Sequence, residues 1–314
     1  MTTSTSVPRT TPAIPTKAFV VIGMGILAIS LASIFIKLAQ QEGVPSLLIA
    51  AGRMTIAALV LTPVTLRRHW NDLQRIGRSE VLFGGLSGLF LAIHFATWIL
   101  SFEYTSVLVS VVLVTTNPLW AALLEMVFLR ARLGRLVILG LIVGVLGSIM
   151  VAFPPTGAIS LGQNPLLGSA LALTGAVAVA VYFVLGRKLR AGLPLLPYIW
   201  LVYSSAAIIL IIVVIVARIP ITGYSASGYF WLVAMALIPQ LIGHSSFNYV
   251  LKFLPASYVG IASQLEPVLS AIIAFFLFRE SPAALQIAGS GIILTGVILA
   301  SLGQSRSSQE TASA

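Results

Sequence analysis

The sequence contains few charged residues and no cysteine. Only 8% of its 314 residues are Asp, Glu, Lys or Arg, whereas a typical soluble domain carries about 25%. Water therefore cannot be the main solvent of this chain. The absence of cysteine excludes disulfides, thiolate chemistry and cysteine-ligated metal, and it indicates nothing about the compartment.

Signatures of enzymes and of ATP-driven pumps are also missing. The chain has no P-loop, no GxSxG nucleophile elbow and no dinucleotide fingerprint. Asp72 is the only aspartate, and the three histidines lack the spacing of metal ligands. We therefore expect a protein that is not an enzyme and that holds no cofactor and no metal. A separate ATPase subunit is left open.

Apolar runs dominate the sequence. Many are roughly 20 residues long, which is the length that crosses a hydrocarbon core about 30 Å thick. They lack the alternation of barrel strands, so membrane-spanning helices are predicted. Ten spans fit, at residues 18–38, 46–66, 80–101, 106–128, 135–152, 166–186, 196–217, 229–251, 256–278 and 283–303.

Basic residues gather on one side of these spans. Fourteen of the 18 Lys and Arg fall on the side of the N-terminus, and the positive-inside rule makes this side cytoplasmic. We expect a multi-pass inner-membrane protein with both termini in the cytoplasm, and no nucleic-acid partner despite the net charge of +10. Lys37 and Arg53, at outer helix ends, are expected to snorkel to the headgroups. Residues 1–16 and 304–314 are predicted to be disordered tails.

An internal repeat divides the chain into residues 17–153 and 154–303. Each half carries five predicted spans, an odd number, so the second half would enter the membrane from the opposite face. Inverted repeats are typical of carriers, although they also occur in channels, and a duplication that merely enlarged a bundle is the alternative. After a shift of 149 residues, the coinciding pairs are Gly43 with Gly192, Pro45 with Pro194, Pro118 with Pro267, Arg130 with Arg279, Gly140 with Gly289, and Gly147 with Gly296.

Residues 254–300 read LPASYVGIASQLEPVLSAIIAFFLFRESPAALQIAGSGIILTGVILA. This stretch has a small-residue start, a mid-helix Pro, a Glu thirteen residues later and a Gly-rich end. In these features it resembles the ninth and tenth helices of the EamA-type transporters of the drug/metabolite transporter superfamily. Residues 105–151 repeat the pattern, except that Ala131 stands where the second half has Glu280. The resemblance covers residues 18–303 and implies ten helices, a central cavity and export or exchange of amino acids, nucleobases, amines or drugs.

Pro118 and Pro267 interrupt corresponding spans of the two halves. Each removes a helix hydrogen bond and frees a carbonyl of the preceding turn. Paired interruptions favour a midplane site or hinge, and a kink that only helps packing is the alternative.

Candidate cavity residues lie on polar stripes of otherwise apolar spans. Ionisable groups inside a membrane are costly and usually face a cavity or a partner. Glu266, next to Pro267, is our hypothesis for a proton carrier or the partner of a substrate amine, and His94 and His244 are the other groups that could titrate near neutral pH. Either histidine could instead be only a structural hydrogen-bond donor. The candidate set is His94, Trp98, Asn117, Tyr182, Gln240, His244, Asn248, Ser263, Gln264 and Glu266.

Together these features predict an all-α polytopic membrane protein of two five-helix inverted repeats around a central cavity. Its predicted function is to export or exchange a small metabolite, an amino acid or a related amphipathic compound, by alternating access, with proton coupling as a further hypothesis. A channel-like uniporter or a drug efflux carrier is the alternative, and a membrane-embedded enzyme is disfavoured. Its expected partners are the substrate, the lipid bilayer and protons. The sequence determines neither the substrate nor the oligomeric state.

Overall fold

A computed structural model describes residues 16–129, 134–152, 164–253, 259, 263, 265–279 and 282–313. In this part of the chain all regular structure is helical and no strand occurs, as the apolar runs predict. The candidate cavity residue Gln264, the predicted tail before residue 16 and Glu280 lie outside the described residues.

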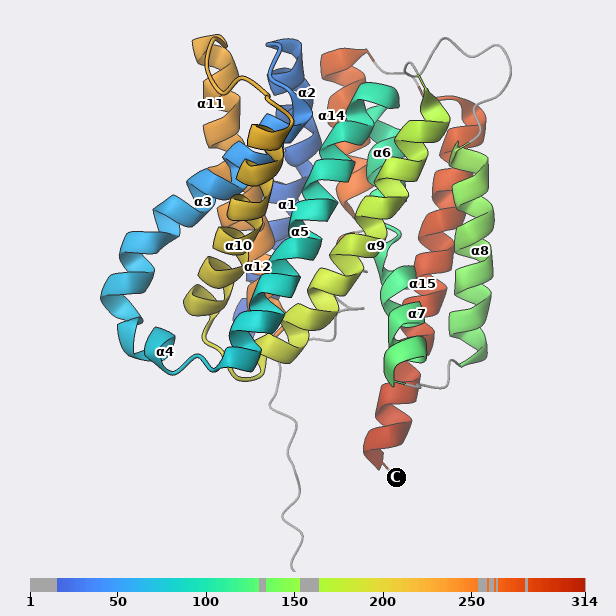
Figure 1. The fold of residues 1–314 in the computed structure, drawn as a ribbon. Helices are drawn as coiled ribbons and strands as arrows, with labels where there is room; N and C mark the ends of the chain where they lie inside the picture. Colours follow the sequence, from blue (N-terminus) through green and yellow to red (C-terminus); the bar gives the residue numbers. More distant parts are fainter. Residues whose placement is uncertain are drawn as a thin grey trace, which may run out of the picture.

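The helices run alternately up and down a single bundle (Figure 1). The part before residue 153 contains α1 (Thr16–Ser30), α2 (Ala32–Gln41), α3 (Ser46–Arg68), α4 (Trp70–Gln74), α5 (Arg78–Tyr104), α6 (Val107–Val114), α7 (Asn117–Leu129) and α8 (Arg135–Ala152). The remainder contains α9 (Pro165–Arg190), α10 (Leu195–Val216), α11 (Ala226–Met235), the π-helix η1 (Ala236–His244), α12 (Ser245–Val250), α14 (Leu265–Phe278) and α15 (Ala284–Ser313).

Membrane-crossing length is confirmed for seven helical segments of the described chain. Three of them contain internal breaks: α1 with α2, α6 with α7, and the run from α11 to α12. Shorter apolar helices occupy 135–147, 265–278 and 284–300, where three more spans are predicted. The protein is therefore a multi-pass membrane protein, and its total of ten crossings stays a prediction.

The two predicted hinge prolines lie in different local settings. Pro118 is the second residue of α7, directly after the turn at Thr115 and Thr116 that separates α7 from α6. A proline in the first turn of a helix loses no intrahelical hydrogen bond, because the N–H groups there have no helical partner. Pro267 lies in α14, whose described part begins at Leu265, two positions after the helical residue Ser263. The role of the two prolines as hinges stays a prediction.

The C-terminal end differs from the prediction. Helix α15 continues to Ser313, whereas residues 304–314 were expected to form a disordered tail. No Gly or Pro follows Gly303, so no residue of the polar end breaks the helix that the apolar part has already started.

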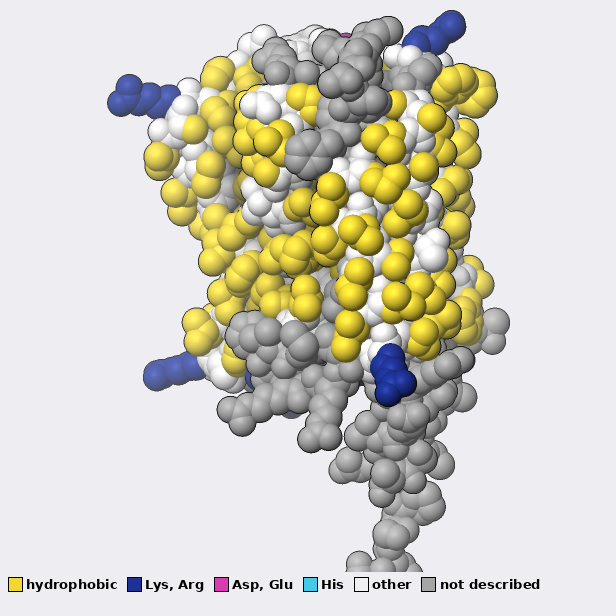
Figure 2. Space-filling model, turned by 90° about the vertical axis from the view of Figure 1, so that its right-hand side faces the viewer, with side chains coloured by type: hydrophobic (Ala, Val, Ile, Leu, Met, Phe, Trp, Pro, Cys, Tyr) yellow, Lys and Arg dark blue, Asp and Glu magenta, His cyan; other side chains and the backbone are white. Residues whose placement is uncertain are grey.

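Hydrophobic side chains form a belt around the side of the bundle that carries α8 and α15, and Lys and Arg side chains lie at its upper and lower edges (Figure 2). Such a belt between charged edges is what a bilayer requires. On α8 the exposed apolar residues are Ile138, Leu139, Ile142, Val145, Leu146 and Ile149.

Helices α8 and α15 approach each other closely through glycines. A Cβ on Gly147 would lie 2.8 Å from the carbonyl oxygen of Gly289, and a Cβ on Gly296 would lie 2.7 Å from that of Gly140. These four glycines therefore let two backbones touch, as small residues do at membrane helix interfaces. The other main helix pairs are α5 with α9, α3 with α10, α5 with α10, and α1 with η1 and α12.

Replacement of Gly296 by Leu should destabilise the protein by roughly 1–3 kcal/mol, because the new side chain must push two backbones apart. Thermal unfolding in detergent measures this loss. Gly291→Leu is the matched control on the same helix, since a Cβ at Gly291 meets nothing within 4 Å. Equal melting temperatures for the two variants would contradict the close α8–α15 contact.

Candidate functional site

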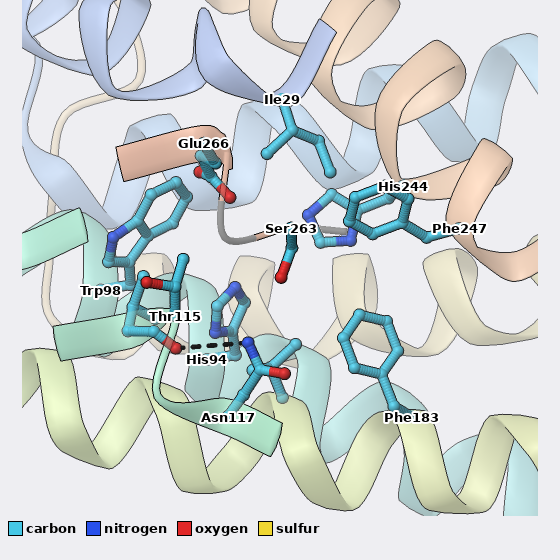
Figure 3. Close-up of a pocket in the computed structure, with 12 residues that line it drawn as sticks. Ile29, His94, Trp98, Thr115, Asn117, Phe183, His244, Phe247, Ser263 and Glu266 are labelled. Carbon is cyan, nitrogen blue, oxygen red and sulfur yellow. Dashed lines mark hydrogen bonds between the residues drawn. The ribbon is translucent and has the colours of Figure 1, made fainter. Parts of the chain in front are cut away.

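A small cavity lies in the interior of the bundle, where α1, α5, α9, η1 and α14 meet the α6–α7 turn (Figure 3). Its free volume is about 30 Å³, which is room for one or two water molecules. Sites for small organic ligands are roughly ten times larger, so the cavity in this conformation is too small for such a ligand. Of the predicted candidates, the cavity brings together His94, Trp98, Asn117, His244, Ser263 and Glu266.

Glu266 enters the cavity from the first turn of α14, where its side chain is 6% exposed. One turn further along, the Ser270 hydroxyl donates a hydrogen bond of 3.0 Å to the carbonyl oxygen of Ser30. Ser30 is the last residue of α1, before the break that separates α1 from α2. The freed carbonyl of a broken helix thus anchors the helix that carries the carboxyl group.

The His94 ring has a defined tautomer. Its Nδ1 lies 2.9 Å from the carbonyl oxygen of Gly175, and because a carbonyl only accepts, Nδ1 must carry the proton. In the neutral imidazole, Nε2 is then a hydrogen-bond acceptor. The ring stacks on Trp98, with centroids 5.6 Å apart and planes 17° apart. Gly175 permits this contact because a Cβ there would lie 3.3 Å from the Cβ of Trp98.

His244 comes to the cavity from the π-helix η1, whose nine residues include Pro239. π-helices are rare and often occur at functional sites. The ring centroid of His244 lies 6.3 Å from that of His94 and 5.2 Å from that of Phe95. Its Nδ1 has no hydrogen-bond partner within the described residues. An imidazole with a free nitrogen at a cavity wall is available to a bound molecule.

Three predicted cavity residues lie beside the cavity instead of on its wall. The Tyr182 hydroxyl donates to Asn248 Oδ1 over 2.8 Å, and Asn248 Nδ2 lies 3.3 Å from the Tyr203 hydroxyl. Gln240 contacts α3. The stripe of Gln240, His244 and Asn248 is about 12 Å long, which exceeds so small a cavity, so only its middle residue reaches the space.

The prediction that Arg53 snorkels to the headgroups is wrong, because its side chain is completely buried. Its Nε donates to Gln240 Oε1 over 2.7 Å, and its Cζ lies 3.9 Å above the centre of the Phe95 ring. A signal was available in the sequence: Arg53 is the eighth residue of α3, which is about 10 Å from the helix start. A cation that deep in an apolar span calls for an interior partner.

The sequence of this chain matches the model of a known protein family. The model of the EamA-like transporter family matches residues 16–153 and again residues 166–302. A protein of Archaeoglobus fulgidus, described as an uncharacterized transporter, is 24% identical over 258 residues, which cover 80% of this chain and 87% of that protein. The uncharacterized transporter YyaM of Bacillus subtilis is 24% identical over 261 residues, which cover 80% and 83%.

Two further proteins are similar to this chain, one in sequence and one in fold. The uncharacterized transporter YdfC of Bacillus subtilis is 24% identical over 189 residues, and the match spans only 60% of the length of either protein. A solved crystal structure superposes with a TM-score of 0.65 at 20% identity and covers 92% of this chain and 98% of its own. At that identity the likeness concerns the fold alone.

Nitrogen-15 NMR of histidine-labelled protein should show one ring protonated at Nδ1 and unprotonated at Nε2 at neutral pH, because the Gly175 carbonyl requires this tautomer. The chain has three histidines, and His94→Asn identifies the signal by removing it. Asn keeps a donor near the position of Nδ1, so the variant should fold. A His94 signal with the proton on Nε2 would contradict the hydrogen bond to Gly175.

Proposed function

The chain belongs to the EamA-like transporter family, and from this premise we propose that it exports or exchanges a small metabolite by alternating access. The proposed substrate is an amino acid or a related amphipathic compound. The observation that carries the proposal is the interior cavity of about 30 Å³ with Glu266 and two histidines in its wall, placed among helices of both halves. Catalytic chemistry forms no part of this function.

The proposal includes ten crossings in two inverted repeats. The α8–α15 contacts support it, because the shift of 149 residues carries the pair Gly140 and Gly296 onto the pair Gly289 and Gly147, and both pairs touch. A two-fold relation between the halves produces such reciprocal contacts. Likewise α3 packs on its own counterpart α10.

The charge distribution supports an orientation with the lower end of Figure 1 in the cytoplasm. Helix α3 ends, α5 begins and α9 ends at this lower end (Figure 1), and the positive-inside rule assigns the basic end to the cytoplasm. Both chain ends would then be cytoplasmic, in the inner membrane of a bacterial-type cell. The described Lys and Arg of the lower loops and helix ends include Lys17, Arg67, Arg68, Arg75, Arg78, Arg135, Arg187, Lys188, Arg190 and Lys252.

Two equivalent latches hold the bundle closed at its opposite ends. At the upper end, Gln40 Nε2 donates to the carbonyl oxygen of Ile99 over 3.2 Å. At the lower end, Arg190 Nε donates to the carbonyl oxygen of Asn248 over 3.2 Å. The shift of 149 residues superposes Ile99 on Asn248 and brings Gln40 within one residue of Arg190. Release of one latch at a time would open the cavity to one side and then to the other.

The cavity wall suits an amphipathic molecule with an amino group. Glu266 is the one buried carboxyl group among the described side chains, and His94 Nε2 adds a second acceptor. Trp98, Phe183 and Phe247 supply aromatic surface, which packs apolar groups and attracts cations. In this mechanism Glu266 exchanges a proton for the substrate amine or binds that amine directly.

Reconstituted protein should exchange one class of compound from a labelled panel of amino acids, nucleobases and cationic amines. We expect saturable exchange that a pH gradient accelerates and that Glu266→Gln reduces at least tenfold, because the variant can neither carry the proton nor pair with an amine. Uptake into liposomes, with and without the gradient, is the measurement.

Glu80→Gln is the matched control, since Glu80 lies at the lower end of α5, away from the cavity wall, and accepts a hydrogen bond from the nearby backbone N–H of Gly77. If neither the pH gradient nor Glu266→Gln changes the exchange rate, the carrier function is supported and the proposed role of Glu266 is wrong. Flux without saturation or counterflow would instead indicate a channel.

Thiol labelling should test the latches, because a chain without cysteine accepts a single reporter. We place the reporter at Val179→Cys, an apolar position of the cavity wall. Gln40→Ala should raise its labelling by a membrane-impermeant reagent in intact cells, and Arg190→Gln should raise it in inverted vesicles. Gln40 also donates to the Ser46 hydroxyl, and Arg190 also donates to the Leu193 carbonyl oxygen, so each variant loses two hydrogen bonds. We expect a rise of roughly two- to tenfold or more.

The neighbouring exposed residues provide controls of the same type, Gln41→Ala and Arg187→Gln. Neither control should change the labelling rate on its side. Equal effects of either latch variant from both sides would indicate general loosening and would rule out two separate gates.

A further inference from the structure

The buried Arg53 guanidinium lacks the anion that its charge requires. A cation removed from water normally pairs with a carboxylate, because the desolvation cost is several kcal/mol. Among the described side chains no carboxylate oxygen lies within 4.0 Å of Arg53, which instead contacts Gln240, the Met235 sulfur and the Phe95 ring. The guanidinium is therefore held by neutral groups alone.

Two hydrogen-bond donors in this cluster have no partner within the described chain. They are Arg53 Nη2 and Gln240 Nε2, both on completely buried side chains. Exchanging the oxygen and nitrogen of the Gln240 amide would not give Nε2 a partner, because Arg53 Nε can only donate and so requires Oε1 of Gln240 opposite it. Two unpartnered donors on joined side chains, one of them charged, match an anion with two acceptor oxygens.

The cluster borders the cavity. The Phe95 ring carries Arg53 on its face and the His244 ring at its edge, with centroids of the two rings 5.2 Å apart. His244 is itself a wall residue of the cavity. Glu266 is a wall residue of the same cavity. The interior thus presents a carboxyl group in the cavity wall and a cation behind the rings of Phe95 and His244.

We propose that Arg53 Nη2 and Gln240 Nε2 bind the carboxylate of a zwitterionic amino acid whose ammonium group is at Glu266. This subsite rests on the proposed transport function and narrows its substrate class. The cavity must widen for the substrate to fit, and movement of Phe95 and His244 joins the two parts into one site. The Arg53–Gln240 hydrogen bond stays intact and aims both free donors at the same carboxylate.

Charge balance favours a zwitterion over other anions. Arg53 and an ionised Glu266 together have no net charge, and a zwitterion adds none, so the filled site stays neutral in a low-dielectric interior. A phosphate monoester or a dicarboxylate would leave excess negative charge there, and a plain amine would leave excess positive charge.

The test compares two amino acids with derivatives that lack one charged group each. L-leucine is measured beside isoamylamine and 4-methylpentanoate, and L-phenylalanine beside 2-phenylethylamine and 3-phenylpropanoate. Ligand-induced thermal stabilisation of the full chain in detergent gives affinities without requiring turnover, and exchange in liposomes gives transport. We expect the wild type to bind an amino acid at least tenfold more tightly than either of its derivatives.

Arg53→Gln should weaken binding of the amino acid by roughly ten- to hundredfold and should not weaken binding of the amine, because it removes a positive charge that repels the amine. Gln240→Glu is the second variant, because it keeps an oxygen for Arg53 Nε and supplies the missing counter-charge, so it should fold. It places a negative charge where the substrate carboxylate would bind, and it should abolish amino acid binding while amine binding persists.

Equal losses for amino acid and amine would overturn the subsite and make Arg53 a structural residue. Tighter wild-type binding of the amines, or stabilisation by chloride that matches the amino acids, would also overturn it, even if the liposomes show saturable exchange and the carrier function stands. If no compound binds and none of the wider panel exchanges, the proposed function fails as well.

Discussion

The structure depends on one constraint: inside a bilayer, every backbone N–H and C=O needs a protein partner. Long helices meet it without help, and a broken helix meets it only where other helices cover the break. The breaks after Ser30, at Thr115 and Thr116, and in η1 all occur at the cavity, which Ile29, Thr115 and His244 line. Irregular backbone is therefore found where a binding site can use the carbonyls and turns that it frees.

The bundle contains two kinds of helix contact, one between α8 and α15 and one around the cavity. Helices α8 and α15 meet through backbone and glycine, which leaves no room for adjustment. The cavity is bounded by broken helices and aromatic rings, which can shift by rotation of side chains or by small changes at a break. In the proposed mechanism, α8 and α15 stay together while the helices around the cavity move relative to them.

Burying a charged side chain costs desolvation free energy, and the described interior contains few such side chains. Arg53, Arg190 and Glu266 are buried, alongside two histidines. Arg190 donates to the backbone carbonyl oxygens of Leu193 and Asn248 at the lower end. Arg53 contacts Gln240 and the Phe95 ring, Glu266 lies in the cavity wall, and no salt bridge joins these two described side chains. Charges held apart in this way are strong sites for groups of opposite sign, and a carrier gains specificity from them because a wrong ligand leaves one of them uncompensated.

The sequence by itself determined the helical class, the multi-pass membrane character and the family, because apolar length and repeated Gly and Pro positions are local properties of the chain. It also identified Glu266, His94 and His244, since a polar group in an apolar span is visible without a fold. Tertiary structure alone decided that Tyr182 and Asn248 hydrogen-bond to each other beside the cavity, and that Arg53 points inward to Gln240, 187 positions away. Helical periodicity gives the face of a residue but not the helix opposite it, and only the packing of distant helices determines which polar groups meet.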